Sequence, residues 1–243
     1  AQFNLGIIYS KGEYTKRDIN KAIYYYTLAA NQNFPQAQNN LGMIYSESEY
    51  IKQDINKAIY YYTLAANQNF LQAQYNLGKI FYFGKYIERD ISKAIQYFSL
   101  ASNQNCPEAR FYLGIIYSNG KYIKQDINKA IQYFSLAADQ NIPQAQFYLG
   151  YIYLNGEYIE RDINKAIQYF SFAANRNFPE AQYILGYIYF AGLFDKKDIY
   201  KGIDFFIQSA SNDCIYAKFV VGYFYQEGKY ITKDIKKSIL NYK

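Results

Sequence analysis

Histidine and tryptophan are both absent from this 243-residue sequence. Without histidine the chain has no imidazole for acid–base catalysis, no Ser–His or Cys–His nucleophile pair, and no histidine ligand for a metal ion. The chain is therefore a poor candidate for an enzyme. We predict no catalytic residue, no cofactor and no metal site.

Cysteine and proline are scarce, with two cysteines, Cys106 and Cys214, and four prolines. Two cysteines do not indicate a disulfide framework, and these two occupy the same place in repeats three apart, so we expect them to lie far from each other as core or turn residues. Free cysteines favour a reducing compartment such as the cytoplasm. Four prolines and fourteen glycines are too few for a collagen-like or disordered chain.

Excess charge and long apolar runs are also missing. The 26 basic and 20 acidic side chains give a net charge of +6, a mild excess that does not by itself indicate nucleic-acid binding. No apolar run approaches the ~20 residues that span a bilayer, so we predict no membrane span. The sequence begins with Ala1 at a repeat boundary and stops inside a predicted helix. We therefore expect an excerpt of a longer protein.

What the sequence does contain is a repeat of 36 residues. The units begin at residues 1, 37, 73, 109, 145, 181 and 217, so that six are complete and the seventh is partial. A Leu-Gly pair marks the first six: Leu5-Gly6, Leu41-Gly42, Leu77-Gly78, Leu113-Gly114, Leu149-Gly150 and Leu185-Gly186, followed by Val221-Gly222. We number positions within each unit so that residues 1, 37 and 73 share position 1. A repeat of this length indicates a helical repeat array.

Each unit predicts two helices, because apolar residues recur at helical spacing in both of its halves. Asp18 stands where the N-cap of the second helix belongs, and Gly12 marks the turn between the two helices. Asn33 is suited to the left-handed position after the second helix, and Pro35 to the first turn of the next helix. The same residues recur in the other units, with Ser48 in place of the turn glycine in the second.

The glycine at position 6 lies inside a predicted helix, where glycine costs roughly 1 kcal/mol relative to alanine. Its recurrence indicates a close approach of the paired helix. We expect the contact to be made by small residues at position 22: Ala22, Ala58, Ala94, Ala130 and Ala166. Stacking of the helix pairs predicts an all-α fold, a right-handed α-α superhelix or solenoid, with a single array over residues 1–243.

The motif resembles the Sel-one-like repeat family, a relative of the tetratricopeptide repeats. Its best copy is the unit at 145–180: Ala145, Gln146, Leu149, Gly150, Tyr153, Gly156, Asp162, Lys165, Ala166, Tyr169, Ala173 and Ala174. The chain departs from the family in having Asn or Asp213 where members usually have glycine after the Ala-Ala pair. The resemblance implies an adaptor or scaffold that holds protein partners, in some cases joined to a kinase domain.

The resemblance also implies that the first helix of each unit lines a concave groove. Positions 3, 4, 7, 10 and 11 then face the groove, and these positions differ most between the copies. The predicted groove is rich in amides in the first three units and aromatic from the fourth onward. The candidate partner-binding residues are Asn4, Asn40, Asn76, Tyr112, Tyr148, Tyr151, Tyr187, Phe190 and Tyr223.

These residue types suit peptide binding. Side-chain amides bond the backbone of an extended peptide, and tyrosines are enriched among residues that dominate binding energy. The alternative is that the aromatic groove only reflects composition, since the chain has 32 tyrosines. A protein or peptide partner is favoured in either case over nucleic acid.

A second candidate surface is the loop before each capping aspartate, where every unit has a base. These bases are Lys16, Arg17, Lys52, Arg89, Lys124, Arg161, Lys196, Lys197 and Lys233. Such an edge suits RNA, an anionic membrane or an acidic partner. Acidic residues such as Glu49 and Glu88 interleave with the bases, which favours an ordinary solvated edge.

The sequence therefore favours a non-catalytic protein-interaction scaffold. An RNA-binding helical array is the first alternative, with Lys79, Arg110 and Lys218 as the main bases of the groove. A passive spacer for a flanking effector domain is the second. Neither the partner nor the oligomeric state is indicated by the sequence.

Overall fold

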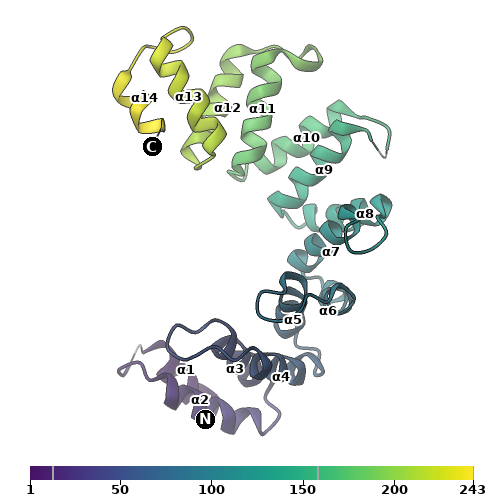
Figure 1. Cartoon of the computed structure of the whole chain (residues 1–243), viewed down its shortest axis with the longest axis vertical. Helices are drawn as coiled ribbons and strands as arrows, with labels where there is room; N and C mark the ends of the chain where they lie inside the picture. The colour runs from purple at the N-terminus through teal and green to yellow at the C-terminus, as the bar shows by residue number, and fades with distance from the viewer. Residues whose placement is uncertain (13, 158, 243) are drawn as a thin grey trace. The chain divides into compact units, whose positions relative to one another are not determined.

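A computed structural model describes residues 1–12, 14–157 and 159–242. This part of the chain forms fourteen α-helices and one 3-10 helix and contains no strand (Figure 1). The first helices of the repeats are α1 (Gln2–Lys11), α3 (Pro35–Glu47), α5 (Leu71–Phe83), α7 (Pro107–Asn119), α9 (Pro143–Asn155), α11 (Pro179–Ala191) and α13 (Ile215–Glu227). The second helices are α2 (Ile19–Ala30), α4 (Ile55–Ala66), α6 (Ile91–Asn103), α8 (Ile127–Ala138), α10 (Ile163–Ala174), α12 (Ile199–Ser211) and α14 (Ile235–Tyr242), and the 3-10 helix η1 (Leu193–Asp195) precedes α12. The predicted all-α, solenoid-like fold is confirmed.

The helices form two compact units, Ala1–Gln125 and Asp126–Lys243. Within each unit a first helix packs on the second helix of its own repeat and on the second helix of the repeat before it. No described helix exceeds 13 residues, and none of them could cross a membrane.

The second helices begin as the sequence predicts. In every repeat the side chain of the capping aspartate accepts a hydrogen bond from the backbone N–H three residues later, as from Lys21 to Asp18 at 3.0 Å. The ammonium group of the same lysine also lies close to the carboxylate, for example 3.3 Å between Lys93 and Asp90. Each cap therefore satisfies a backbone group that the helix itself leaves unpaired.

The predicted turns are also present. Gly12 and Asn33 have φ angles of 74° and 59°, in the left-handed region that glycine and asparagine tolerate best. Pro35 opens α3 at its first turn. Ser48, which replaces the turn glycine of the second repeat, has an extended backbone with φ of −69°, so the loop after α3 leaves its helix differently from the others.

The contact of the position-6 glycine differs from the prediction. A Cβ atom on Gly42 would lie 2.6 Å from the ring of Tyr62, and one on Gly78 would lie 2.5 Å from the ring of Phe98. The glycine therefore makes room for the aromatic ring at position 26 of the same repeat. Position 22 is among the nearest contacts in the sixth repeat, where the backbone oxygen of Gly202 would lie 3.1 Å from a Cβ atom on Gly186. At Gly42 and Gly78 the ring is nearer than the predicted alanine.

From the second repeat to the fifth the core consists of the same positions: the alanines at positions 1, 22 and 29, the leucine at position 5, and the ring at position 26. In the first repeat Ala1 is exposed, and in the seventh the ring of Tyr242 is 45% exposed. Cys106 and Cys214 are buried and free, each at the N-cap of a first helix. They are core residues of the turn, as the sequence predicts.

Buried glutamines at position 2 connect successive repeats. The side-chain amide of Gln38 donates to the carbonyl of Ala30 in the preceding repeat at 3.2 Å. The amide of Gln68 in turn donates to the side-chain oxygen of Gln38 at 2.8 Å. Both ends of a buried polar side chain are thereby satisfied, and the helices of neighbouring repeats are fixed in register.

Candidate functional site

The residues at position 4 lie partly against the core. Asn4 is exposed on α1, whereas Asn40 and Asn76 are half-buried on α3 and α5. Tyr112 is stacked on Phe98 with ring centroids 5.0 Å apart, and Tyr148 is stacked on Phe134 with centroids 5.2 Å apart. The side chain at position 4 therefore covers the ring at position 26 of the preceding repeat.

The ring at position 26 is a tyrosine in some repeats and a phenylalanine in others, and each tyrosine hydroxyl has a polar partner at position 10. The buried hydroxyl of Tyr62 is hydrogen-bonded to the hydroxyl of Ser46 at 3.2 Å. The hydroxyl of Tyr26 is likewise hydrogen-bonded to the hydroxyl of Ser10 at 3.1 Å. The hydroxyl of Tyr242 donates a hydrogen bond to the side-chain oxygen of Gln226 at 3.2 Å. Where position 26 is phenylalanine, position 10 is Tyr82, Ser118, Leu154 or Phe190.

Much of the change from amides to aromatics along the first helices is thus explained by packing. Asn40 and Asn76 follow repeats with a tyrosine at position 26, and Tyr112 and Tyr148 follow repeats with a phenylalanine. This pairing is visible in the sequence, as a correlation between positions 26, 10 and the next position 4. The interpretation of these positions as a diversified groove overlooked it.

Phe190 is also a packing residue. Its ring lies 5.3 Å from that of Phe224 and 5.1 Å from that of Tyr230, measured between centroids. Gly202 stands opposite, where a Cβ atom would lie 2.6 Å from the backbone nitrogen of Phe190. In the sixth repeat the glycine that replaces the usual alanine at position 22 therefore permits a close approach of the backbone of Phe190.

The tyrosines at position 7 are different, because they are half exposed. Tyr151 on α9, Tyr187 on α11 and Tyr223 on α13 are 48%, 53% and 50% exposed. All three belong to the unit 126–243 and lie at the same place on successive first helices. Among the predicted partner-binding residues, these three present the largest apolar surface to solvent.

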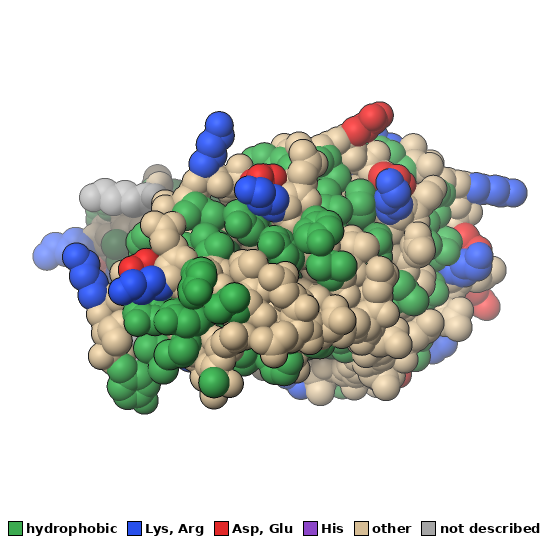
Figure 2. All heavy atoms as spheres, turned by 90° about the horizontal axis from the view of Figure 1, so that it is seen from below, with side chains coloured by type: hydrophobic (Ala, Val, Ile, Leu, Met, Phe, Trp, Pro, Cys, Tyr) green, Lys and Arg blue, Asp and Glu red, His purple; other side chains and the backbone are tan. Residues whose placement is uncertain are grey.

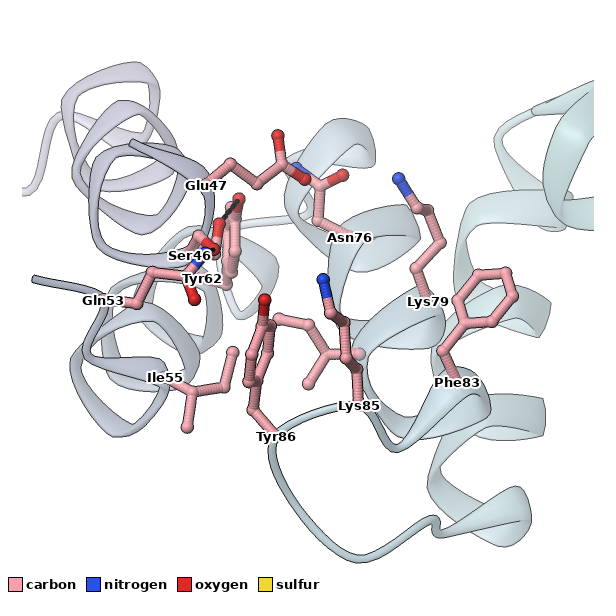
Figure 3. A pocket seen from close by; sticks show the side chains of 11 residues that line it. Ser46, Glu47, Gln53, Ile55, Tyr62, Asn76, Lys79, Phe83, Lys85 and Tyr86 are labelled. Carbon is pink, nitrogen blue, oxygen red and sulfur yellow. Dashed lines mark hydrogen bonds between the residues drawn. The ribbon is translucent and has the colours of Figure 1, made fainter. Parts of the chain in front are cut away.

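A pocket of about 360 Å³ lies in the unit 1–125, between the second and third repeats (Figure 3). Asn76 and Lys79 project into it from α5, and Lys85 and Tyr86 come from the loop after α5. The remaining lining residues are Ser46, Glu47, Gln53, Ile55, Tyr62, Ile80 and Phe83. We refer to this cavity as the 2–3 pocket. Of the predicted partner-binding residues, the 2–3 pocket contains Asn76.

The two lysines of the 2–3 pocket are not paired with acids. The ammonium nitrogen of Lys79 lies 5.6 Å from the ring centroid of Tyr75, and that of Lys85 lies 4.8 Å from that of Tyr86. In the described part of the chain no carboxylate lies within 4.0 Å of either ammonium group. A hydrogen bond from Lys85 holds the pKa of Tyr86 below its ordinary value, because the ammonium group favours the phenolate.

A smaller pocket of about 220 Å³ occupies the same register between the sixth and seventh repeats. It is lined by Phe190, Tyr223, Phe224, Glu227, Lys229 and Tyr230. We refer to it as the 6–7 pocket. It has a lysine and a tyrosine at positions 13 and 14, as the 2–3 pocket has, but Tyr223 stands at position 7 where the 2–3 pocket has Lys79.

The basic loop edge is partly engaged within the chain. The guanidinium group of Arg17 lies 4.2 Å from the ring centroid of Tyr50 and donates to its hydroxyl at 3.0 Å. Arg89 makes the same contacts with Tyr122, and Arg161 lies over Phe194. These arginines connect the loops of neighbouring repeats. Figure 2 shows one face of the molecule, where basic and acidic side chains adjoin each other among many hydrophobic side chains.

The described residues contain no group of three or more cysteine, aspartate and glutamate side chains arranged to hold a metal ion. The chemistry that they offer is recognition: exposed aromatic rings, side-chain amides and unpaired ammonium groups on the first helices and the loops that follow them.

Seven in-register helix pairs of this kind define a helical repeat array. The model of the Sel1 repeat matches residues 1–34, 35–70, 71–106, 107–142, 143–178, 179–214 and 215–243. The chain therefore belongs to the Sel1 repeat family, and the predicted resemblance is confirmed. Proteins of this family are generally protein-interaction scaffolds.

Two solved structures are similar over 99% of this chain. A Sel1 repeat protein from Oxalobacter formigenes has 29% sequence identity and a TM-score of 0.89, and the match covers 69% of that protein. A protective antigen of uropathogenic Escherichia coli with an SLR fold has 27% identity and a TM-score of 0.85. The chain spans about half the length of the E. coli protein, 52%. A search of curated protein sequences gave no match.

An immunity protein of Pseudomonas aeruginosa, Pa5087, is more distant. It has 19% identity and a TM-score of 0.55, with 86% of this chain and 79% of that chain covered. This likeness concerns the fold alone.

Proposed function

We propose that this chain is a non-catalytic scaffold that binds a protein partner on the exposed side of its first helices. The observation that carries the proposal is the row of half-exposed tyrosines at position 7, Tyr151, Tyr187 and Tyr223. Tyrosine provides a large, stiff contact area with a hydroxyl group at its edge, so it contributes much binding energy and remains compatible with water.

These tyrosines are not needed for packing in the way that Tyr112 and Phe190 are. Position 7 holds Ile7, Met43 and Lys79 in other repeats, so the helix accepts very different side chains there. A position that is tolerant in folding and aromatic on the surface supports a role in binding. Tyr148 and Phe190, which belong to the same unit, contribute to this surface through their packing on Phe134 and Phe224.

The test is a variant in which Tyr151, Tyr187 and Tyr223 are all replaced by serine. We expect its thermal unfolding to stay close to that of the native chain, because surface substitutions usually change stability by within about 0.5 kcal/mol each. Affinity enrichment followed by mass spectrometry would then show which proteins bind the native chain and are lost from the variant.

The matched control replaces two exposed aromatic residues on second helices of the same unit, Phe172 and Tyr200, by serine. They are 44% and 77% exposed, so a similar apolar area is removed from another face. Loss of the partners from the control variant as well would contradict the assignment to the first helices. Partners captured only through a salt-sensitive RNA component would favour the RNA-binding alternative, and reproducible capture of nothing would favour a spacer.

A further inference from the structure

The 2–3 pocket has a combination of charge and apolar surface that the 6–7 pocket lacks. We propose that it binds an acidic side chain or a terminal carboxylate of a partner peptide, together with an apolar residue next to it. The inference rests on the proposed function and deepens it, because it names the chemistry of one partner segment on the first-helix surface.

The first argument is charge. Lys79 and Lys85 contribute two positive charges to the pocket and Glu47 contributes one negative charge, so its lining has a net charge of +1. The cap lysines, such as Lys57, lie within 4.0 Å of an aspartate, whereas the two pocket lysines have no such neighbour in the described chain. An ammonium group that already has a carboxylate partner gains little from a second carboxylate. The ammonium groups of Lys79 and Lys85 remain available to bind a carboxylate of a ligand.

The second argument is the position of the donors. Asn76 lies one helical turn before Lys79 on α5, so that the amide and the ammonium group project from the same face of the helix (Figure 3). The ring of Tyr86 lies beneath Lys85 and restricts where its ammonium group can go. A carboxylate bound between α5 and the following loop would thus meet two ammonium groups and an amide donor.

The third argument is the apolar wall. Ile55, Ile80 and Phe83 line the same pocket, and the ring of Phe83 is 47% exposed. A free inorganic anion would leave this surface in contact with water. A peptide with an apolar residue beside its acidic residue would cover the wall and satisfy the lysines together.

Glu47 sets a limit on the orientation of the ligand. It stands at the end of α3, on the opposite side of the pocket from Lys79 (Figure 3). Like charges repel, so a bound carboxylate is favoured on the α5 side and disfavoured beside α3. Replacement of Glu47 by glutamine removes the repulsion and should strengthen the binding of acidic peptides.

The chain itself supplies substitutions that the fold accepts. Position 7 is isoleucine in the first and fourth repeats, Ile7 and Ile115, which makes Lys79→Ile a conservative change for folding. Position 13 is glutamate in the second and fifth repeats, Glu49 and Glu157. Lys85→Glu is therefore also a conservative change for folding. A loss of binding in these variants would therefore reflect the pocket and not the fold.

The experiment begins with a display library of random dodecapeptides selected on the immobilised native chain. We expect the selected peptides to be enriched in aspartate or glutamate next to an apolar residue, relative to the starting library. One selected peptide and its Asn/Gln counterpart are then synthesised with a fluorescent label, and their dissociation constants are measured by fluorescence anisotropy. The acidic form should bind about tenfold more tightly.

Substitutions in the 2–3 pocket test whether this pocket causes the preference for the acidic peptide. Lys79→Ile and Lys85→Glu should each weaken the acidic peptide by about threefold to tenfold and leave its amide counterpart unchanged. Glu47→Gln should strengthen the acidic peptide. Lys229→Glu, the same substitution at position 13 of the 6–7 pocket, is the matched control and should have no effect.

Three results would overturn the inference. If the acidic and amide peptides bind equally well, the lysines do not contribute to binding. If Lys229→Glu weakens the acidic peptide as much as Lys85→Glu does, only the overall charge of the chain matters. Displacement of the peptide by inorganic phosphate or acetate at equal concentration would show a simple anion site. If no peptide is selected, the inference is wrong, while the serine variant of Tyr151, Tyr187 and Tyr223 still decides the proposed function independently.

Discussion

At the scale of single residues, the most informative contact is the buried hydroxyl at position 26. Tyr62 is 2% exposed, and its hydroxyl is hydrogen-bonded to Ser46. A buried hydroxyl without a partner is costly, whereas a phenylalanine at the same place needs none. The repeats use both solutions: each tyrosine at position 26 has a polar partner at position 10, whereas beside a phenylalanine position 10 varies from Ser118 to Phe190.

A prediction follows for Ser46→Ala. The substitution leaves the hydroxyl of Tyr62 without its serine partner and should lower the free energy of unfolding by about 1–2 kcal/mol. Urea denaturation followed by circular dichroism measures this change.

The control is the double variant Ser46→Ala, Tyr62→Phe. Because four other repeats have phenylalanine at position 26, the double variant should recover most of the lost stability. Additive losses from the two single substitutions would show that the hydroxyls do not depend on each other.

Residues with a strong local role were predictable from the sequence. Asp18 caps a helix, Asn33 adopts a left-handed conformation, and Gly12 ends a first helix, because each function depends on a few neighbouring backbone atoms. Contacts between helices were less predictable. The spacing that indicates a close approach at Gly42 does not say which residue of the paired helix approaches.

The candidate site was predicted in part for the same reason. Tyr151, Tyr187 and Tyr223 at position 7 are half exposed, whereas Ile7 packs partly against the core, so the role of this position in binding stays a prediction. The 2–3 pocket was missed because it combines α5 with a loop and the end of α3, and Lys79 was considered only as a base for RNA. The signal that could have indicated it is the occurrence of lysine at both positions 7 and 13 in the third repeat alone.

At the scale of the helices, the two members of a repeat within one unit are held together by a ring fitted against a glycine. Gly78 on α5 faces Phe98 on α6, and both are buried. The helix tolerates the low propensity of glycine because an alanine would displace the ring.

We therefore predict that Gly78→Ala destabilises the chain despite the better helix propensity of alanine. Overpacking costs typically about 1–3 kcal/mol, and the gain in propensity is about 1 kcal/mol, so a net loss of up to about 2 kcal/mol is expected. Differential scanning calorimetry checks the result.

Gln96→Ala, at an exposed position on α6, serves as the comparison. It should leave the melting temperature almost unchanged or raise it slightly. A higher melting temperature for Gly78→Ala would mean that the ring at position 26 can shift without cost.

At the scale of the whole molecule, buried tyrosine hydroxyls couple folding to alkaline pH. Burial raises the pKa of Tyr62, Tyr75 and Tyr112 above the ordinary value of 10.0, because the charged phenolate is poorly solvated inside the fold. Below pH 10 these groups are neutral in both the folded and the unfolded chain. Above it the unfolded chain loses its protons first, so stability falls as the pH rises.

We expect the urea midpoint to decrease steadily as the pH rises above about 10. Tyr62→Phe removes one of the buried hydroxyls and should make this decrease shallower, whereas lysines that lose their charge in the same range affect both proteins equally. An identical pH dependence in the two proteins would contradict a role for the buried hydroxyl.

The pairing of positions within repeats has a consequence for how such a chain can change by recombination. Ser46 and Tyr62, Gly78 and Phe98, and Phe190 and Gly202 each belong to a single repeat. A gene duplication that copies or removes whole repeats keeps these partners together. A crossover inside the sixth repeat, between the codons for Phe190 and Gly202, would instead place an alanine from another copy against the backbone of Phe190. The internal fit of each repeat thus favours insertions and deletions whose ends lie at repeat boundaries. The stacking of position 4 on the ring of the preceding repeat crosses these boundaries, so it favours joining repeats that have the same kind of ring.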